Sequence, residues 1–97
     1  MANVLNANPI VIDTVAADVV ITTAPLKMFL MEFVANGAPG RVVLIDGLGN
    51  LKAILDVPAA TGGVDRQEWH FPVYVNDLIV DQSASTFPAG STLLIYV

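Results

Sequence analysis

The sequence predicts an all-β fold: a small antiparallel β-sandwich or jelly-roll-like barrel of about seven to eight strands. Two observations support this prediction. The apolar residues fall into short runs rich in Val, Ile, Leu and aromatic residues, a composition typical of strands. Clusters of Gly, Pro, Asn and Asp separate these runs about every 8–12 residues, as in sandwiches and barrels. A chain of 97 residues with this many strands leaves no room for a layer of helices.

The predicted strands follow one another through short connections. They cover residues 10–13, 18–23, 27–35, 41–46, 51–57, 69–75, 78–81 and 93–97. The run at 51–57 also fits one face of a helix, but it is short and ends beside Pro58, which favours a strand. Pro72 interrupts a later run, and residues 58–67 and 82–91 are predicted to be loops.

The longest apolar run, residues 27–35, is apolar on both faces of a strand except at Glu32, so we expect both faces to be covered. The turn at 36–40 joins it to the strand that begins at Arg41, which predicts a β-hairpin with a five-residue loop. This register places Glu32 opposite Leu44, so an ion pair between Glu32 and Arg41 needs a bulge or a diagonal reach. Otherwise Glu32 has a structural partner elsewhere, for instance on a neighbouring subunit.

We expect one domain at residues 10–97, preceded by a polar N-terminal arm at residues 1–9 that is flexible or lies on a neighbouring molecule. The arm contains Asn3, Asn6, Asn8 and Pro9. No apolar run reaches the ~18–20 residues that span a bilayer, and the first residues lack the basic segment of a signal peptide. The last predicted strand runs to Val97, so we expect the C-terminus to be tied into a sheet.

The composition indicates a surface that other proteins cover. Hydrophobic residues make up 55% of the chain and charged residues 13%, about half of the usual ~25%. Because the cores of interfaces are depleted in charge, we infer that neighbouring subunits hide part of this surface. The alternative is a monomer whose surface is made polar by Thr, Ser, Asn and Gly. The net charge of −5 and the scattered basic residues argue against nucleic acid and against an anionic membrane.

The motifs that suggest chemistry are weak. Gly47-Leu48-Gly49 follows a strand, but a dinucleotide-binding loop needs a glycine where Lys52 stands, so an Asp-Gly turn is the better interpretation. His70 is the single histidine, and the residue that shares its strand face is Glu68. A structural polar contact in the sheet or between subunits fits His70 better than catalysis, which needs an orienting acid and a reacting group.

Serines, carboxylates and cysteines give no further site. Ser83, Ser85 and Ser91 lie in a predicted loop without the pattern of a catalytic triad. The nine carboxylates flank strands and turns without the spacing of a calcium loop, and a cation shared between subunits is the alternative. The absence of cysteine excludes disulfides and thiolate metal sites. We therefore predict no catalytic, cofactor-binding or metal-binding residue, and no enzyme activity.

Three aromatic residues lie close together in the chain. Alternation along a strand places Trp69 and Phe71 on one face and Tyr74 on the other. Core packing is the preferred interpretation of all three. A sugar-stacking platform requires Pro72 to kink the strand and bring Tyr74 round.

The order of strands and turns over residues 27–97 resembles a known group of proteins. It consists of Leu44-Ile45-Asp46-Gly47, Leu51-Lys52-Ala53-Ile54-Leu55, Phe71-Pro72-Val73-Tyr74-Val75, Asn76-Asp77-Leu78-Ile79-Val80 and Gly90-Ser91-Thr92-Leu93-Leu94-Ile95-Tyr96-Val97. This order is similar to that of small β-sandwich decoration (cement) proteins of tailed-bacteriophage capsids and related virion proteins. The resemblance implies trimeric knobs on the capsid lattice, often with an N-terminal arm on a neighbour. It rests on a pattern of strands and turns, so no functional residue is carried across.

The expectation is therefore a non-enzymatic virion structural protein. It is expected to form a homotrimer, to bind the major capsid protein and to stabilise capsid contacts, with Met28, Leu30 and Val34 supplying part of the subunit or sandwich packing. It is expected to be made in the host cytoplasm and to lie on the capsid surface, without a cofactor and without nucleic-acid or membrane partners. The alternatives are a tail, neck or fibre component, and a carbohydrate- or receptor-binding module that uses Trp69 and Tyr74.

Overall fold

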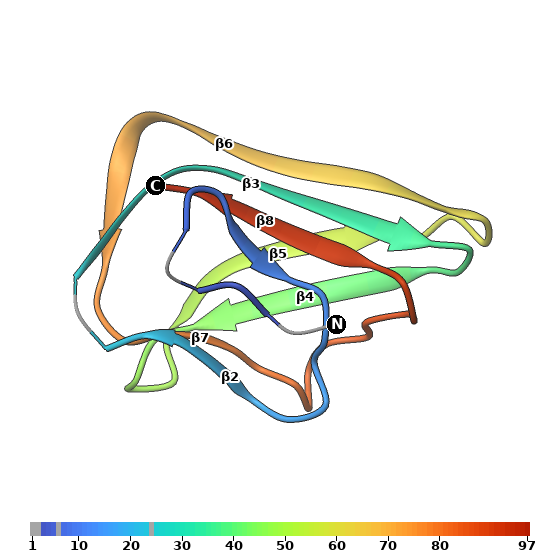
Figure 1. Cartoon of the computed structure of the whole chain (residues 1–97), viewed down its shortest axis with the longest axis horizontal. Coiled ribbons are helices and arrows are strands. Elements are labelled where there is room, and N and C mark those ends of the chain that lie inside the picture. Colours follow the sequence, from blue (N-terminus) through green and yellow to red (C-terminus); the bar gives the residue numbers. More distant parts are fainter. Residues whose placement is uncertain (1–2, 6, 24) are drawn as a thin grey trace.

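The computed structural model describes residues 3–5, 7–23 and 25–97, and all regular structure in them is β (Figure 1). The strands are β1 (Ile10–Ile12), β2 (Val19–Thr22), β3 (Leu26–Asn36), β4 (Gly40–Ile45), β5 (Leu51–Val57), β6 (Gly62–Val75), β7 (Leu78–Val80) and β8 (Thr92–Tyr96). They form two four-stranded sheets: sheet A in the order β1-β8-β3-β6 and sheet B in the order β2-β7-β4-β5. Paired strands are antiparallel throughout both sheets. The predicted all-β antiparallel sandwich is confirmed.

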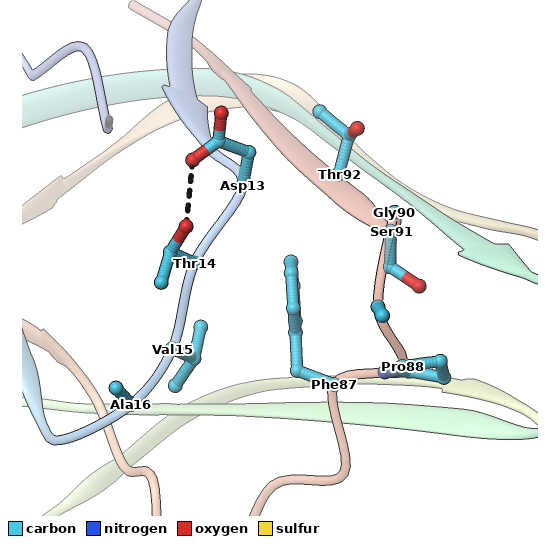
Figure 2. A pocket seen from close by; sticks show the side chains of 10 residues that line it. Asp13, Thr14, Val15, Ala16, Phe87, Pro88, Gly90, Ser91 and Thr92 are labelled. Carbon is cyan, nitrogen blue, oxygen red and sulfur yellow. Dashed lines mark hydrogen bonds between the residues drawn. The ribbon is translucent and has the colours of Figure 1, made fainter. Parts of the chain in front are cut away.

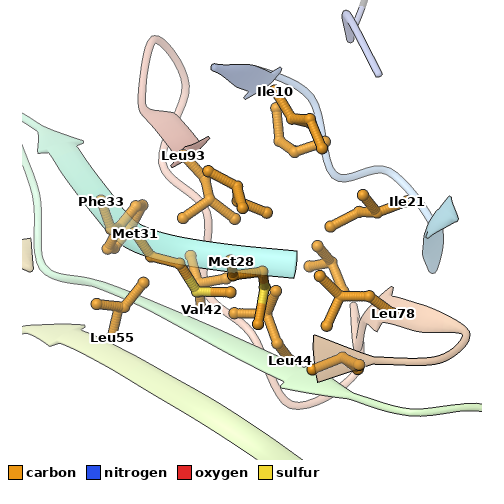
Figure 3. Close-up of a cluster of buried hydrophobic side chains, with 14 of the residues drawn as sticks. Ile10, Ile21, Met28, Met31, Phe33, Val42, Leu44, Leu55, Leu78 and Leu93 are labelled. Atoms are coloured by element: carbon orange, nitrogen blue, oxygen red, sulfur yellow. The ribbon is translucent and has the colours of Figure 1, made fainter. Parts of the chain in front are cut away.

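The core lies between the two sheets, where apolar side chains from both meet (Figure 3). The buried apolar residues of this core are Ile10, Ile12, Ile21, Met28, Met31, Phe33, Ala35, Val42, Leu44, Leu55, Val57, Val75, Leu78, Val80, Leu93 and Ile95. Most follow the alternation of a strand with one buried face, for example Val42 and Leu44 in β4 or Leu93 and Ile95 in β8. Burial of this apolar surface is the main favourable term in folding.

The predicted hairpin between β3 and β4 is wrong. β3 pairs with β6 and β8 in sheet A, whereas β4 pairs with β5 and β7 in sheet B. The turn at 37–39 therefore carries the chain across the core. A carbon atom added at Gly40 would lie 2.7 Å from Cζ of Phe33, so the start of β4 packs directly on the inner side of β3. This crossing sets the apolar rows of the two strands face to face, which a hairpin within one sheet cannot do.

β3 does not keep strict alternation, because its pairing with β6 is interrupted. Met28 pairs with Val73 and Leu30 pairs with Glu68, so Phe29 alone faces residues 69–72 of β6. This bulge turns Met28 toward the core together with Met31, although their sequence separation is odd. The expected covering of both strand faces holds in part: Leu30 is half-buried and Phe29 is exposed.

The loop predicted at 58–67 is shorter than expected, because β6 begins at Gly62 and continues through Pro72 to Val75. Pro72 is tolerated because β6 is the edge strand of sheet A and the proline lies in the bulge, where a missing N–H breaks no ladder. In Figure 1, β6 bends sharply at the left end of the molecule.

The described part of the predicted arm is hydrogen-bonded to this same chain. Val4 and Val11 exchange two backbone hydrogen bonds of 2.8 and 2.9 Å. The side-chain oxygen of Asn3 accepts hydrogen bonds from the amides of Asp13 and Thr14. Asn8 donates to the carbonyl oxygen of Val97 and accepts from its amide, so the C-terminal residue, which follows β8 directly, is tied to the arm. Asn6 of the arm lies outside the described residues.

Candidate interaction surfaces

The Gly47-Leu48-Gly49 motif forms the predicted tight turn. Asp46 accepts hydrogen bonds from the amides of Leu48 and Asn50 at 2.9 Å and from the Asn50 side chain at 3.2 Å. The backbone hydrogen bond from Asn50 is the largest cause of a pKa of Asp46 below its ordinary value of 3.8. The Asn50 side chain, the Leu48 amide and the Lys52 ammonium, 3.5 Å away, lower the same pKa further. The polar groups of this segment are thus engaged in holding the turn.

The outer face of sheet A is largely apolar. We call this the A face, and it consists of Val11, Leu30, Val34, Leu94 and Tyr96, all half-buried. The register makes it continuous, because Leu94 pairs with Val11 on one side and Leu30 pairs with Tyr96. Leu30 and Val34, which we expected to serve subunit or sandwich packing, lie here, whereas Met28 lies in the core.

An ion pair crosses the A face. The guanidinium of Arg66 lies 2.8 Å from the carboxylate of Glu32, across the β3–β6 pairing. This hydrogen bond, and then the charge of Glu32, raises the pKa of Arg66 above its ordinary value. The ion pair considered between Glu32 and Arg41 does not form, because the two residues lie in opposite sheets. Arg41 pairs instead with Asp56 of the neighbouring strand at 3.4 Å.

The outer face of sheet B carries a second apolar row. We call this the B face, and it consists of Val20, Ile45, Ile54 and Ile79, with Val43 buried on the same side of the sheet. The pairing connects Val20 through Ile79 to Ile45, and sets Val43 beside Ile54. Val20 is 50% exposed and Ile54 44% exposed. Apolar side chains gathered on one outer face of a domain are a feature of interaction sites.

The bulge in β6 leaves a group of aromatic side chains exposed at one end of sheet A. Phe71 is 76% exposed, Tyr74 70% and Phe29 40%. Core packing is therefore wrong for Phe71 and Tyr74, and correct for Trp69, which is half-buried against the core. Alternation fails here because four residues of β6 face one residue of β3.

The exposed aromatic group has basic neighbours. The ammonium of Lys27 lies 5.2 Å from the centroid of the Phe29 ring, and Lys27 pairs with Tyr74 across the strands. The ring of His70 meets that of Phe71 edge-on, with centroids 5.0 Å apart. His70 is thus exposed beside Phe71, not on the opposite face of a regular strand. We call Lys27, Phe29, His70, Phe71 and Tyr74 the aromatic end.

A pocket of about 510 Å³ opens beside the start of β8 (Figure 2). Residues 13–16 line one side and residues 87–92 the other. Phe87 projects between the two walls, and its ring lies 5.6 Å from that of the buried Phe33. Asp13 and Thr14 stand at the polar side, where the Thr14 hydroxyl donates to Asp13 at 3.0 Å. Sequence reasoning missed this pocket, because its two walls are more than seventy residues apart in the chain.

The serines that we considered have structural roles. Ser85 accepts a hydrogen bond from the Val43 amide and donates to the carbonyl of Asp81. The buried Ser91 accepts from the Asn36 amide, and Ser83 donates to the Asp81 carboxylate. Across residues 3–5, 7–23 and 25–97, no group of three or more His, Cys, Asp or Glu side chains is placed to hold a metal ion.

Comparisons with known proteins gave no relatives: no family model, curated protein or solved structure matches this chain. Within the described ranges, none of the regular elements is a helix of the length and apolarity needed to cross a membrane. The apolar surfaces and the pocket are therefore the features from which a function is inferred.

Proposed function

We propose that this chain is a non-enzymatic structural subunit that assembles with copies of itself and with other protein subunits through its apolar outer surfaces. The single observation that supports this most is the apolar outer surface on both sides of the sandwich, half-buried along the A face and exposed at Val20 and Ile54 on the B face. An interface needs an apolar centre with few charges, and a domain with 13% charged residues supplies such surfaces readily.

The specific role that we propose is that of a capsid decoration protein. A protein that stabilises contacts between major capsid subunits works by contact area and symmetry, so it requires apolar surfaces and no reactive group. The strand order that resembles phage decoration proteins supports this role. We propose a homotrimer on the outer surface of a virion, with the major capsid protein as its partner and the host cytoplasm as its site of synthesis.

The oligomeric state tests the general proposal. We expect size-exclusion chromatography with light scattering to give a mass above that of one chain at micromolar concentration. Replacing Val20 and Ile54 on the B face with lysine should lower this mass or weaken association, because burying a charge at an interface is costly. Leu48→Lys is the control, since Leu48 is 88% exposed in the turn between β4 and β5. A wild-type protein that is monomeric under these conditions contradicts the proposal.

The location in a particle tests the specific role. We expect peptides of this chain in purified virions, in the capsid fraction after heads are separated from tails. Recovery with tails, necks or fibres instead supports the alternative virion role, and absence from particles contradicts both.

A second candidate function is recognition of a carbohydrate. The observation that favours it is the exposure of Phe71 and Tyr74, since aromatic faces that reach solvent can stack on sugar rings. Trp69 is not suited to this role, because it packs against the core. Binding on a glycan array that disappears in Tyr74→Ala, with an unchanged circular dichroism spectrum, is the expected result for this function.

A further inference from the structure

The pocket beside β8 is large enough to hold a side chain of the aromatic end. Phe71 is the most exposed aromatic side chain among the described residues, and the His70 ring supports it edge-on at 5.0 Å. The pocket lining includes the apolar side chains of Val15, Ala16, Phe87 and Pro88. A cavity of about 150 Å³ is enough to bind a benzene ring, so a pocket of about 510 Å³ has room for a phenylalanine side chain.

The two sites are also complementary in charge. Lys27 is the basic residue of the aromatic end and lies over the ring of Phe29, whereas the Asp13 carboxylate lines the pocket. The chain holds four basic residues against nine acidic ones, so a basic group beside an exposed aromatic cluster is uncommon on this surface. Opposite charges at the margin of a contact favour one orientation of the two partners.

The chain itself holds the pocket wall in place. The Asn3 side-chain oxygen accepts hydrogen bonds from the amides of Asp13 and Thr14 at 2.8 and 3.0 Å. A wall fixed in this way loses less conformational freedom when a partner binds. The N-terminal arm thus supports the pocket from within the same chain.

The two sites cannot meet within one molecule. The bent part of β6 lies at the left end of Figure 1, whereas the loop that enters β8 lies toward the right. We propose that Phe71 of one copy inserts into the pocket between residues 13–16 and 87–92 of the next copy, with Lys27 facing Asp13. This inference rests on the proposed self-assembly and identifies one of its contacts. Such a head-to-tail contact uses two different surfaces, and it closes into a ring when the rotation between copies allows it.

Mixing two variants tests this arrangement. Phe71→Ala removes the inserted side chain and leaves the pocket intact, whereas Ala16→Trp fills the pocket and leaves Phe71 intact. Each variant alone should associate about tenfold more weakly than wild type, or worse, because one buried aromatic contact is lost. In a mixture of the two, unlike copies should associate more strongly than either variant does alone, since Phe71 of the Ala16→Trp copy can enter the open pocket of the Phe71→Ala copy. Light scattering and sedimentation velocity measure both outcomes.

Control variants and a charge exchange keep the result unambiguous. Leu48→Ala removes another exposed apolar side chain and should leave the mass unchanged, and circular dichroism checks that each variant folds. If Ala16→Trp does not fold, Ala89→Trp fills the same pocket from its other wall. Lys27→Asp should weaken association, and combination with Asp13→Lys should restore it.

The outcomes separate this inference from the proposed function. If wild type is monomeric, the self-assembly itself is wrong. If wild type is oligomeric but Phe71→Ala leaves its association unchanged, the head-to-tail contact is wrong and self-assembly stands. A mixture of the two folded variants that remains monomeric also overturns the contact.

Discussion

Replacement of Gly62 by alanine should destabilise the protein more than the same replacement at Gly49. Both glycines have left-handed backbones, with φ of +82° and +83°. A Cβ atom at Gly49 meets nothing within 4 Å, whereas at Gly62 it overlaps the carbonyl oxygen of Ala35 and lies 2.8 Å from the amide nitrogen of Gly37. These are backbone atoms at the turn that leaves β3, so no side chain can move aside.

The expected magnitudes follow from these contacts. A left-handed backbone costs an alanine about 1–2 kcal/mol, and the lower entropy of the unfolded chain returns about 0.4–1 kcal/mol. We therefore expect Gly49→Ala to lower the free energy of unfolding by about 1 kcal/mol. Gly62→Ala adds the cost of overpacking, about 1–3 kcal/mol.

Urea denaturation followed by tryptophan fluorescence measures both values. The variants must be compared at one protein concentration, because the proposed association would contribute to apparent stability. Equal losses of stability in the two variants would refute the reasoning, since they would mean that the close approach of β6 to the turn after β3 has no energetic effect.

Three other variants test the core, the turn and the A face. Phe33→Ala should lower the free energy of unfolding by about 3–5 kcal/mol, because the ring is fully buried; a loss below 1 kcal/mol in urea would contradict this packing. Asp46→Asn should lose stability relative to wild type at pH 7. Because folding lowers the Asp46 pKa, the carboxylate stabilises the folded state at pH values above its ordinary pKa of 3.8. This stabilisation disappears as the pH falls through the pKa of the folded state. A difference in unfolding free energy between wild type and Asp46→Asn that stays constant as the pH is lowered would contradict this. Arg66→Gln should lower the free energy of unfolding only slightly, since Arg66 is largely exposed and solvent screens its pair with the half-buried Glu32, and 1 M salt should reduce the difference further; a large loss that salt does not change would contradict this.

The strands were predictable because local pattern determines them. β5 has its predicted bounds, and the apolar run from Lys27 to Ala35 lies within β3. The pairing of β3 was not predictable from local pattern. A turn such as that at 37–39 joins paired strands or strands in facing sheets equally well, and only the sum of distant contacts decides. Here the partners of β3 come from β6 and β8, far along the chain, so the predicted hairpin failed.

The candidate surfaces also divide into features that local pattern predicts and features that depend on distant pairing. Leu30 and Val34 were identified as apolar positions available for packing, and both lie on the A face. The exposed aromatic end was not predicted. It depends on the bulge at which Phe29 of β3 faces residues 69–72 of β6, and this bulge interrupts the alternation of side chains between the two faces of the sheet. Pro72 was the only sequence signal for this bulge. The interpretation of Pro72 as a kink that turns Tyr74 toward the face of Trp69 and Phe71 is the prediction most similar to the observed arrangement.

Each edge of the two sheets is partly covered, short or bent, which bears on the proposed assembly. Val4 covers part of the β1 edge with two backbone hydrogen bonds, and β2 is only four residues long. On β5, the Asp65 carboxylate accepts a hydrogen bond from the Asp56 amide at 2.8 Å. On β6, the bulge at Pro72 bends the edge. Covered, short or bent edges resist pairing with other strands. The proposed self-assembly would therefore rely on side-chain contacts of the faces and ends more than on pairing of edge strands.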